Sequence, residues 1–198
     1  MNAREEILRR LGDASAEVTG YDAIPRRYLR RHHDGDVVDL FAERAADYGA
    51  EVRRVARAKL PAVLGEPGSR FAVPAGLPDA WTAEVDVVRD DPPLSVAELD
   101  ALDGVVTGCA VAIAETGTVV LDHGAGQGRR ALTLVPDVHL VIALTSQIVA
   151  DVPESIERLS PDRPITFVSG PSATSDIELS RVEGVHGPRH LSILIVDD

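Results

Sequence analysis

The sequence contains a single cysteine, few aromatic residues and no long apolar run. Its 198 residues include only Cys109, and aromatic residues make up 4% of the chain. One thiol cannot by itself hold an internal disulfide, an iron–sulfur cluster or a structural zinc ion. No window approaches the roughly 18 apolar residues of a membrane span, and the N-terminus lacks a signal-peptide core. We therefore expect a cytoplasmic chain with no cofactor and no metal of its own.

Basic residues are also scarce relative to acidic ones. Lys and Arg number 20 against 32 Asp and Glu, which gives a formal net charge of -12. A surface this negative repels the phosphate backbone of nucleic acids, so DNA and RNA are unlikely partners. The 44% hydrophobic and 26% charged residues are typical of a soluble globular domain that buries its own core.

Residues 1–35 predict a short helix followed by a flexible arm. Asn2 and Glu5 have the spacing of a capping box, and Gly12 is a helix stop. The apolar residues of one helix face are Ile7, Leu8 and Leu11. The arm contains a basic cluster between Arg26 and His33 but too few apolar residues for a core. We expect this arm to be mobile or to fold only against a partner. Its basic cluster is either a solvated charge run or a grip for an acidic partner or an anionic ligand.

Residues 36–198 predict an α/β domain, in which a mixed sheet carries helices on both faces. The expected helices lie at about 36–48, 59–64, after Ser95 and at 146–159. The expected strands lie at 51–55, 70–73, 85–88, 104–107, 109–114, 118–122, 131–135, 139–144, 165–168 and 191–197. The strands between 104 and 144 are too close together for a helix between each pair, so some must be antiparallel neighbours.

Three segments after apolar strands combine turn glycines with polar groups, as ligand-binding loops of α/β proteins do. In the first, Glu115 follows an apolar run and begins a tight turn at the end of the sheet. Its carboxylate is a candidate catalytic nucleophile or general base, and the alternative is a turn glutamate that accepts backbone N–H bonds. The candidate ligand-binding residues of this turn are Thr116, Gly117 and Thr118.

The second segment is a glycine-rich loop at residues 123–130. Its G-x-G-x-G spacing and the expected strand after it exclude a dinucleotide-binding fingerprint. Loop N–H groups at Gly126, together with Arg129 and Arg130, are candidates for binding a phosphate or carboxylate. The alternative is a mobile surface loop.

The third segment gathers hydroxyl and acidic residues after a strand, which favours an anion cradle over a simple connecting turn. The candidate ligand-binding residues are Ser169, Gly170, Ser172, Thr174, Asp176 and Glu178. His186, further along, is a candidate as well. It lies four residues before His190, but Gly187 and Pro188 forbid a helix between them, which argues against a metal pair.

Several segments together resemble the lactate utilization protein C family, which contains the LUD domain. They are the run from Thr107 to Leu121 with its AETGT turn, the stretch 134–139, and the GPSATSDIE segment with the ending at 185–188. The resemblance implies a fold like the ribose-5-phosphate isomerase, glucosamine-6-phosphate deaminase and CoA-transferase group. It also implies a role beside two iron–sulfur partners in oxidising L-lactate to pyruvate. Glu115, Thr116 and Gly117 are similar to the Glu-x-Gly turn that holds the nucleophile of CoA transferases.

The resulting hypothesis is a cluster-free subunit of an iron–sulfur lactate oxidation system that binds a small anion between the three segments. One alternative is a non-catalytic scaffold or interaction subunit. Another is an independent acyl, CoA or sugar-phosphate enzyme of the same fold group. If the three segments converge, Glu115 should face Ser172, Thr174 and Asp176, with Arg129 or Arg130 near enough to bind an anion.

Overall fold

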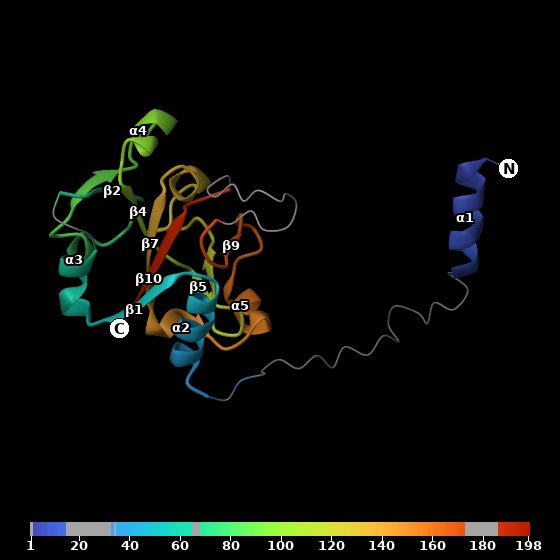
Figure 1. Cartoon of the computed structure of the whole chain (residues 1–198), viewed down its shortest axis with the longest axis horizontal. Coiled ribbons are helices and arrows are strands. Elements are labelled where there is room, and N and C mark those ends of the chain that lie inside the picture. The colour runs from blue at the N-terminus through green and yellow to red at the C-terminus, as the bar shows by residue number, and fades with distance from the viewer. Residues whose placement is uncertain (1, 15–32, 34, 65–67, 173–185) are drawn as a thin grey trace.

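Two β-sheets form the body of the protein in the computed structural model, which describes residues 2–14, 33, 35–64, 68–172 and 186–198 (Figure 1). The strands are β1 (Glu51–Val55), β2 (Arg70–Val73), β3 (Asp86–Arg89), β4 (Gly104–Gly108), β5 (Val111–Ile113), β6 (Thr118–Leu121), β7 (Val138–Leu144), β8 (Ile148–Val149), β9 (Thr166–Val168) and β10 (His190–Val196). The helices are α1 (Ala3–Ala14), α2 (Val37–Asp47), α3 (Leu60–Val63), α4 (Val96–Asp100) and α5 (Val152–Arg158).

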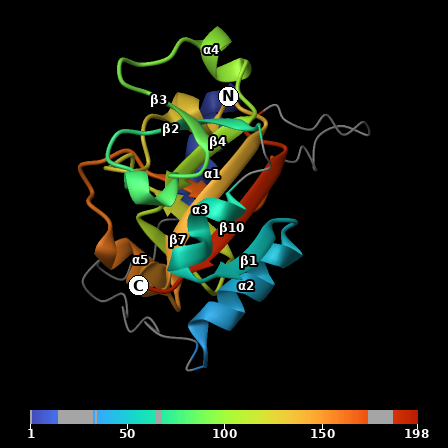
Figure 2. The same ribbon diagram turned by 90° about the vertical axis from the view of Figure 1, so that its left-hand side faces the viewer.

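The larger sheet is parallel throughout and has the strand order β1-β10-β7-β4-β2-β3. Its central strands β7 and β10 lie side by side, and α3 lies in front of the sheet in Figure 2. Both strands consist mainly of apolar residues that are buried, as expected where a parallel sheet is covered on both faces.

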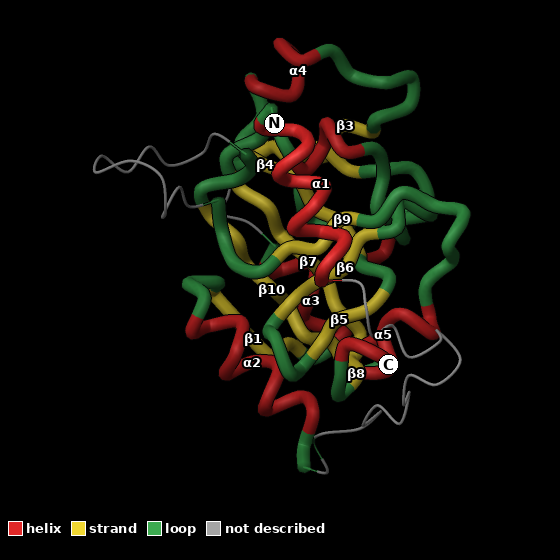
Figure 3. The backbone as a smooth tube through the Cα atoms, turned by 90° about the vertical axis from the view of Figure 1, so that its right-hand side faces the viewer, coloured by secondary structure: helices red, strands yellow, loops and turns green. Residues whose placement is uncertain are grey.

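The smaller sheet has the order β8-β5-β6-β9 and faces the viewer in Figure 3. In this sheet β5 pairs with β8 in parallel and with β6 in antiparallel fashion, and β6 and β9 are antiparallel. The predicted α/β class is confirmed, as is the prediction of antiparallel neighbours in this part of the chain. The antiparallel pairs, β5 with β6 and β6 with β9, are confined to the smaller sheet.

The main core lies between the two sheets and against α2. It includes Phe41 and Ala45 from α2, Ala112 and Val119 from the smaller sheet, and Ile193 from the larger sheet. A second core on the opposite face of the larger sheet is covered by α3. A third, on the outer face of the smaller sheet, is covered by the chain that follows α5. These layers fix the loops at the sheet ends, where the polar segments lie.

The N-terminal helix forms where the sequence predicts it, but it does not stop at Gly12 and continues to Ala14. The Asn2 side chain accepts a hydrogen bond from the Glu5 N–H at 2.9 Å, and the Glu5 carboxylate accepts one from the Asn2 N–H at 3.0 Å. Figure 1 shows α1 away from the α/β body. Its apolar residues are exposed, and the rest of the predicted arm up to residue 32 lies outside the described residues.

Two predicted elements are wrong. Residues 131–135 were expected as a strand, but Arg130–Thr133 forms a 3-10 turn that places Leu132 in an apolar cluster beside α4. The expected helix at 146–159 begins only at Val152, because residues 148–149 pair with β5 as strand β8. Pro153 therefore lies in the first turn of α5, where a missing N–H is tolerated, and does not kink a longer helix.

Among the helices of the described residues, none has the length and apolar character needed to cross a membrane.

Candidate functional site

Polar side chains gather in two places at the ends of the strands. We call the first the acid–histidine cluster, made of His33, Glu115 and Asp151. We call the second the arginine pocket. It is a cavity of about 250 Å³ whose polar lining comes mainly from Arg130, Thr133, His139, Ser169, Ser172 and His186.

Strand pairing brings the two carboxylates of the acid–histidine cluster together. Strands β5 and β8 are parallel neighbours, with Ile113 opposite Val149. Each acidic residue comes two positions after the end of its strand, and the Glu115 N–H donates to the Ala150 carbonyl at 2.9 Å. Glu115 and Asp151 therefore lie side by side at the carboxyl edge of the smaller sheet, a common position for functional groups in α/β proteins.

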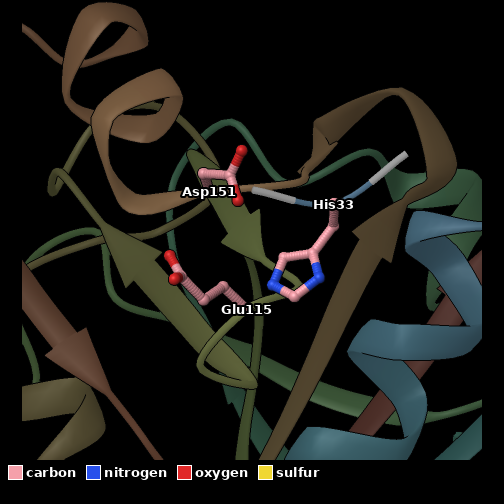
Figure 4. A group of neighbouring side chains, drawn as sticks. All are labelled: His33, Glu115 and Asp151. Atoms are coloured by element: carbon pink, nitrogen blue, oxygen red, sulfur yellow. The ribbon is translucent and has the colours of Figure 1, made fainter. Parts of the chain in front are cut away.

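His33, four residues before α2, completes this cluster (Figure 4). One ligand atom from each of the three side chains lies within 4.8 Å of the others. Asp151 is fully buried, whereas His33 and Glu115 are half-buried. Glu115 also accepts a hydrogen bond from the Val152 N–H at 3.4 Å, in the first turn of α5. An imidazole and two carboxylates in this arrangement can bind a cation.

The arginine pocket lies where the carboxyl end of β9 meets the amino ends of β7 and β10. Ser169 directly follows β9, and His139 is the second residue of β7. The loop from Ser169 to Ser172 is tied to the segment before β10, since the Ser172 N–H donates to the Pro188 carbonyl at 2.8 Å. The His186 N–H donates to Ser172 Oγ at 3.3 Å. Two segments far apart in the sequence thus form one wall.

Arg130 supplies the positive charge of the pocket. One guanidinium nitrogen donates to the carbonyl and the hydroxyl of Thr133 at 2.8 and 3.0 Å, and the other donates to the His186 carbonyl at 3.2 Å. In the part of the chain that the structure describes, no carboxylate pairs with Arg130. These neutral acceptors hold the guanidinium group in position, and they do not neutralise its charge.

His139 is a buried histidine at the lining of the same pocket. Its side chain is 1% exposed, and Nε2 lies 2.8 Å from the Thr107 hydroxyl on the neighbouring strand β4. Burial, together with the positive charge of Arg130, lowers the pKa of His139 to about 3. The ring is therefore neutral at physiological pH. Its Nδ1 makes no hydrogen bond to a described residue, which leaves one ring nitrogen for a ligand.

A chain of hydroxyl groups joins the Glu115 turn to the arginine pocket. Thr116 Oγ1 donates to Thr118 Oγ1 at 2.8 Å, and Thr118 Oγ1 lies 2.8 Å from Ser169 Oγ. Both segments pack on the end of α2 through glycines. A Cβ on Gly117 would lie 2.4 Å from the Ala45 nitrogen, and a Cβ on Gly170 would lie 2.4 Å from the Tyr48 carbonyl oxygen. Both glycines also have positive φ, +59° and +82°.

The glycine-rich loop does not supply the free N–H groups that the sequence suggested. The N–H of Gly126 donates to the Ala75 carbonyl at 2.9 Å, and that of Gly124 donates to the Asp122 carboxylate at 3.0 Å. Arg129 forms a two-pronged ion pair with Asp90, at 2.7 and 2.8 Å. Burial raises the pKa of Asp90, but hydrogen bonds from Arg129 and the Leu94 N–H outweigh it and leave the pKa below its usual value. Gly126 and Arg129 are thus engaged in holding the fold.

The structure brings together only part of the site predicted from the sequence. Arg130, Ser169, Gly170, Ser172 and His186 all line the arginine pocket. Glu115 instead lies near Asp151 and His33 (Figure 4), and it is not among the residues that line that pocket. The remaining candidates, Thr174, Asp176 and Glu178, lie outside the described residues.

Two site residues were missed. Asp151 lies between the apolar residues IVA of the β8 segment and Val152, and His139 lies within the apolar run VHLVIAL of β7. A single polar residue within an apolar run could have identified them. Such a residue is expected to be buried, and a buried polar or charged group needs a compensating partner.

Residues 96–196 of the chain match the LUD domain family. A lactate utilization protein C from Deinococcus radiodurans is 52% identical over 169 residues, which cover 81% of this chain and 80% of the relative. The chain belongs to the LUD domain family. The match includes both sites apart from His33.

Other relatives match a smaller share of their own length. A lactate utilization protein C from Geobacillus kaustophilus is 36% identical over 66% of this chain and 59% of the relative. The uncharacterized protein YkgG of Escherichia coli is 33% identical over 62% of this chain and 58% of the relative. A crystal structure of a DUF162 family protein from Deinococcus radiodurans superimposes with a TM-score of 0.70 at 45% identity. It covers 81% of this chain and 96% of that one, which confirms the fold.

Proposed function

We propose that this LUD domain protein is a cluster-free subunit of a lactate utilization system and binds a small carboxylate, such as L-lactate or pyruvate, in the arginine pocket. The names of its relatives support the pathway. The observation that carries the site is that Arg130, which pairs with no carboxylate among the described residues, lines one small cavity together with the neutral, buried His139.

The chemistry of the pocket suits a 2-hydroxy or 2-keto acid. A guanidinium binds a carboxylate through charge-assisted hydrogen bonds. Neutral His139 offers one ring nitrogen to a hydroxyl or keto oxygen, and the hydroxyls of Ser169 and Ser172 add neutral donors. The cavity volume of about 250 Å³ is below the roughly 300 to 1,000 Å³ of typical drug-sized sites, which favours a small metabolite.

The oxidation of lactate releases two electrons, which we assign to iron–sulfur partner subunits. Cluster ligands are thiolates. The only cysteine, Cys109, is buried in the core, and burial raises the pKa of its thiol to about 12. This chain therefore cannot supply the thiolates of a cluster. Purification of the protein from its native cell, followed by iron analysis of the proteins that accompany it, tests this assignment. Repeated recovery without any iron protein would contradict it.

A specific observation also favours an interaction role. The apolar face of α1 is exposed, with 59%, 56% and 60% of the surface of Ile7, Leu8 and Leu11 accessible. Such a face is suited to packing on a partner subunit. The alternative of an acyl or sugar-phosphate enzyme has less support, because its nucleophile would be Glu115. That residue lies beside a second carboxylate, where an anionic substrate is repelled.

Calorimetric titration of the full chain with L-lactate and pyruvate tests the arginine pocket. Arg130→Gln removes the charge while keeping a hydrogen-bonding side chain, and we expect it to weaken binding about 10- to 100-fold. Arg54→Gln is the matched control, since Arg54 is an exposed arginine paired with Asp39 outside the pocket. Equal affinity in both variants, or no binding by the unaltered protein at millimolar ligand, would contradict the proposal.

A further inference from the structure

We propose that the acid–histidine cluster of His33, Glu115 and Asp151 binds one divalent first-row transition ion, with Zn²⁺ as the probe. This site is distinct from the arginine pocket and departs from the expectation that the chain holds no metal. The acid–histidine cluster is proposed to bind a cation, whereas the arginine pocket is proposed to bind an anion.

The geometry of the cluster is close to what such an ion requires. Metal bonds to imidazole nitrogen and carboxylate oxygen are about 2.0 to 2.2 Å, so two ligand atoms of a tetrahedral ion are about 3.4 Å apart. The three ligand atoms already lie within 4.8 Å of one another. A closure of at most about 1.4 Å between any two of these atoms brings them to the separation of a tetrahedral ion.

The fold holds two of the ligands in place. Glu115 and Asp151 extend from paired strands, and the backbone bond between Glu115 and Ala150 fixes their separation. The fully buried Asp151 carboxylate cannot turn away into solvent. Ligands built on rigid elements lose little freedom when an ion binds, which favours affinity.

The two carboxylates of the cluster attract a divalent cation, because opposite charges that lie close together interact favourably. A cavity of about 280 Å³ adjoins the cluster and is lined by Ala150 and Pro153, which flank Asp151. Glu154 and Glu157 line the same cavity, and Glu154 forms an ion pair with Arg158 at 2.9 Å.

The ligand types select the class of metal. One imidazole and two carboxylates form a mixed nitrogen and oxygen set, which suits Zn²⁺, Mn²⁺ or Fe²⁺. Ca²⁺ and Mg²⁺ instead take oxygen ligands, and soft Cu(I) favours sulfur. Three protein ligands leave at least one coordination position of the ion for water or a small molecule, as in catalytic zinc sites.

Titration of the full chain, stripped with chelator, tests the site. We expect the unaltered protein to bind about one equivalent of Zn²⁺ and, when loaded with Co²⁺, to show the visible absorption of a nitrogen- and oxygen-ligated ion. His33→Gln removes the only nitrogen ligand at a half-buried position, so it should fold normally. It should weaken Zn²⁺ binding at least about 10-fold and abolish the Co²⁺ spectrum.

His190→Gln is the matched control, because His190 is an exposed histidine outside both the cluster and the arginine pocket and should leave Zn²⁺ binding unchanged. Glu115→Gln is a second test, and it should weaken binding without removing the imidazole. The proposal is overturned if His33→Gln binds Zn²⁺ as the unaltered protein does, or if the unaltered protein binds none at about 100 μM. Neither result depends on lactate binding, so failure here leaves the proposed function standing.

Discussion

The acid–histidine cluster and the arginine pocket carry opposite charges, although a short chain of hydroxyl groups connects them. The cluster lies past the carboxyl ends of the parallel strands β5 and β8. Its two acidic residues each come two positions after a pair of residues that lie opposite one another in these strands. The pocket lies at the amino ends of β7 and β10, where an arginine and a neutral histidine face the loop after β9. The comparison teaches that strand pairing, and not sequence proximity, decides which polar residues share a site.

Both sites depend on the two glycines that pack on the end of α2, and their loss should have the largest effect. In Gly117→Ala or Gly170→Ala, the new Cβ meets backbone at 2.4 Å and the residue keeps a positive φ. We expect each substitution to lower the free energy of unfolding by about 3 kcal/mol. Urea unfolding measures this effect.

Gly35→Ala is the matched control, since nothing lies within 4 Å of a Cβ at that position. A loss below about 1 kcal/mol at Gly117 or Gly170 would show that α2 can shift away from the loops, and that they are not fixed by it.

Arg129 and Arg130 are neighbours in the sequence, but we expect the charge of Arg129 to stabilise the fold and that of Arg130 to bind a ligand. Arg129 bonds to the Asp90 carboxylate, whose side chain is 6% exposed, while Arg130 bonds to neutral acceptors. Arg129→Gln should lower the free energy of unfolding by about 2 kcal/mol, because it leaves a buried carboxylate without its cation. Arg130→Gln should have a smaller effect on stability but a larger one on anion binding. Thermal unfolding of both variants tests the difference, and the opposite order of stabilities would refute it.

The pH dependence of stability distinguishes the neutral histidine of the pocket from exposed histidines. The pKa of His139 is about 3 in the folded protein against an ordinary value of 6.5, so the unfolded chain binds more protons between these pH values. The free energy of unfolding therefore falls as pH decreases from 6.5. This group alone should remove about 2 kcal/mol by about pH 5.

His139→Gln should flatten the stability profile over that range, whereas His190→Gln, at an exposed position, should not. Denaturant unfolding at several pH values gives the slopes. Parallel profiles for the unaltered protein and His139→Gln would mean that His139 becomes protonated within the folded protein.

The smallest effect concerns the hydroxyl link between the two sites. Ser169→Ala removes one partner of Thr118, whose hydroxyl keeps its bonds to Thr116. We expect a loss of about 1 kcal/mol or less in stability and unchanged binding of Zn²⁺. A marked change in Zn²⁺ affinity, measured by calorimetry, would show that the two sites are coupled.

Local signals in the sequence predicted much of the fold. The capping boxes at Asn2 and Ser95, the apolar spacing of α2 and the apolar run of β10 each predict an element that the structure contains. The helix expected at 146–159 does not form over its first residues, because residues 148–149 pair with β5 as a strand. This pairing joins segments that are distant in the sequence, and a local pattern of apolar residues cannot predict it.

The candidate site was predicted only in part, for the same reason. Hydroxyl-rich turns after strands identified the Ser169–Ser172 loop, and either Arg129 or Arg130 was expected near it. The sequence could not show that Arg129 is engaged by Asp90, 39 residues away, or that Asp151 lies beside Glu115. The pairing of β5 with β8 brings Asp151 to Glu115, and the folding of the chain between residues 90 and 129 brings Arg129 to Asp90.

A crossed titration tests the central claim that the chain has two separate sites of opposite charge preference. The unaltered protein, His33→Gln and Arg130→Gln are each titrated with Zn²⁺ and with L-lactate. We expect His33→Gln to weaken only Zn²⁺ binding and Arg130→Gln to weaken only lactate binding, each by about 10-fold or more. Loss of both ligands in either variant, or of neither ligand in both variants, would contradict the claim.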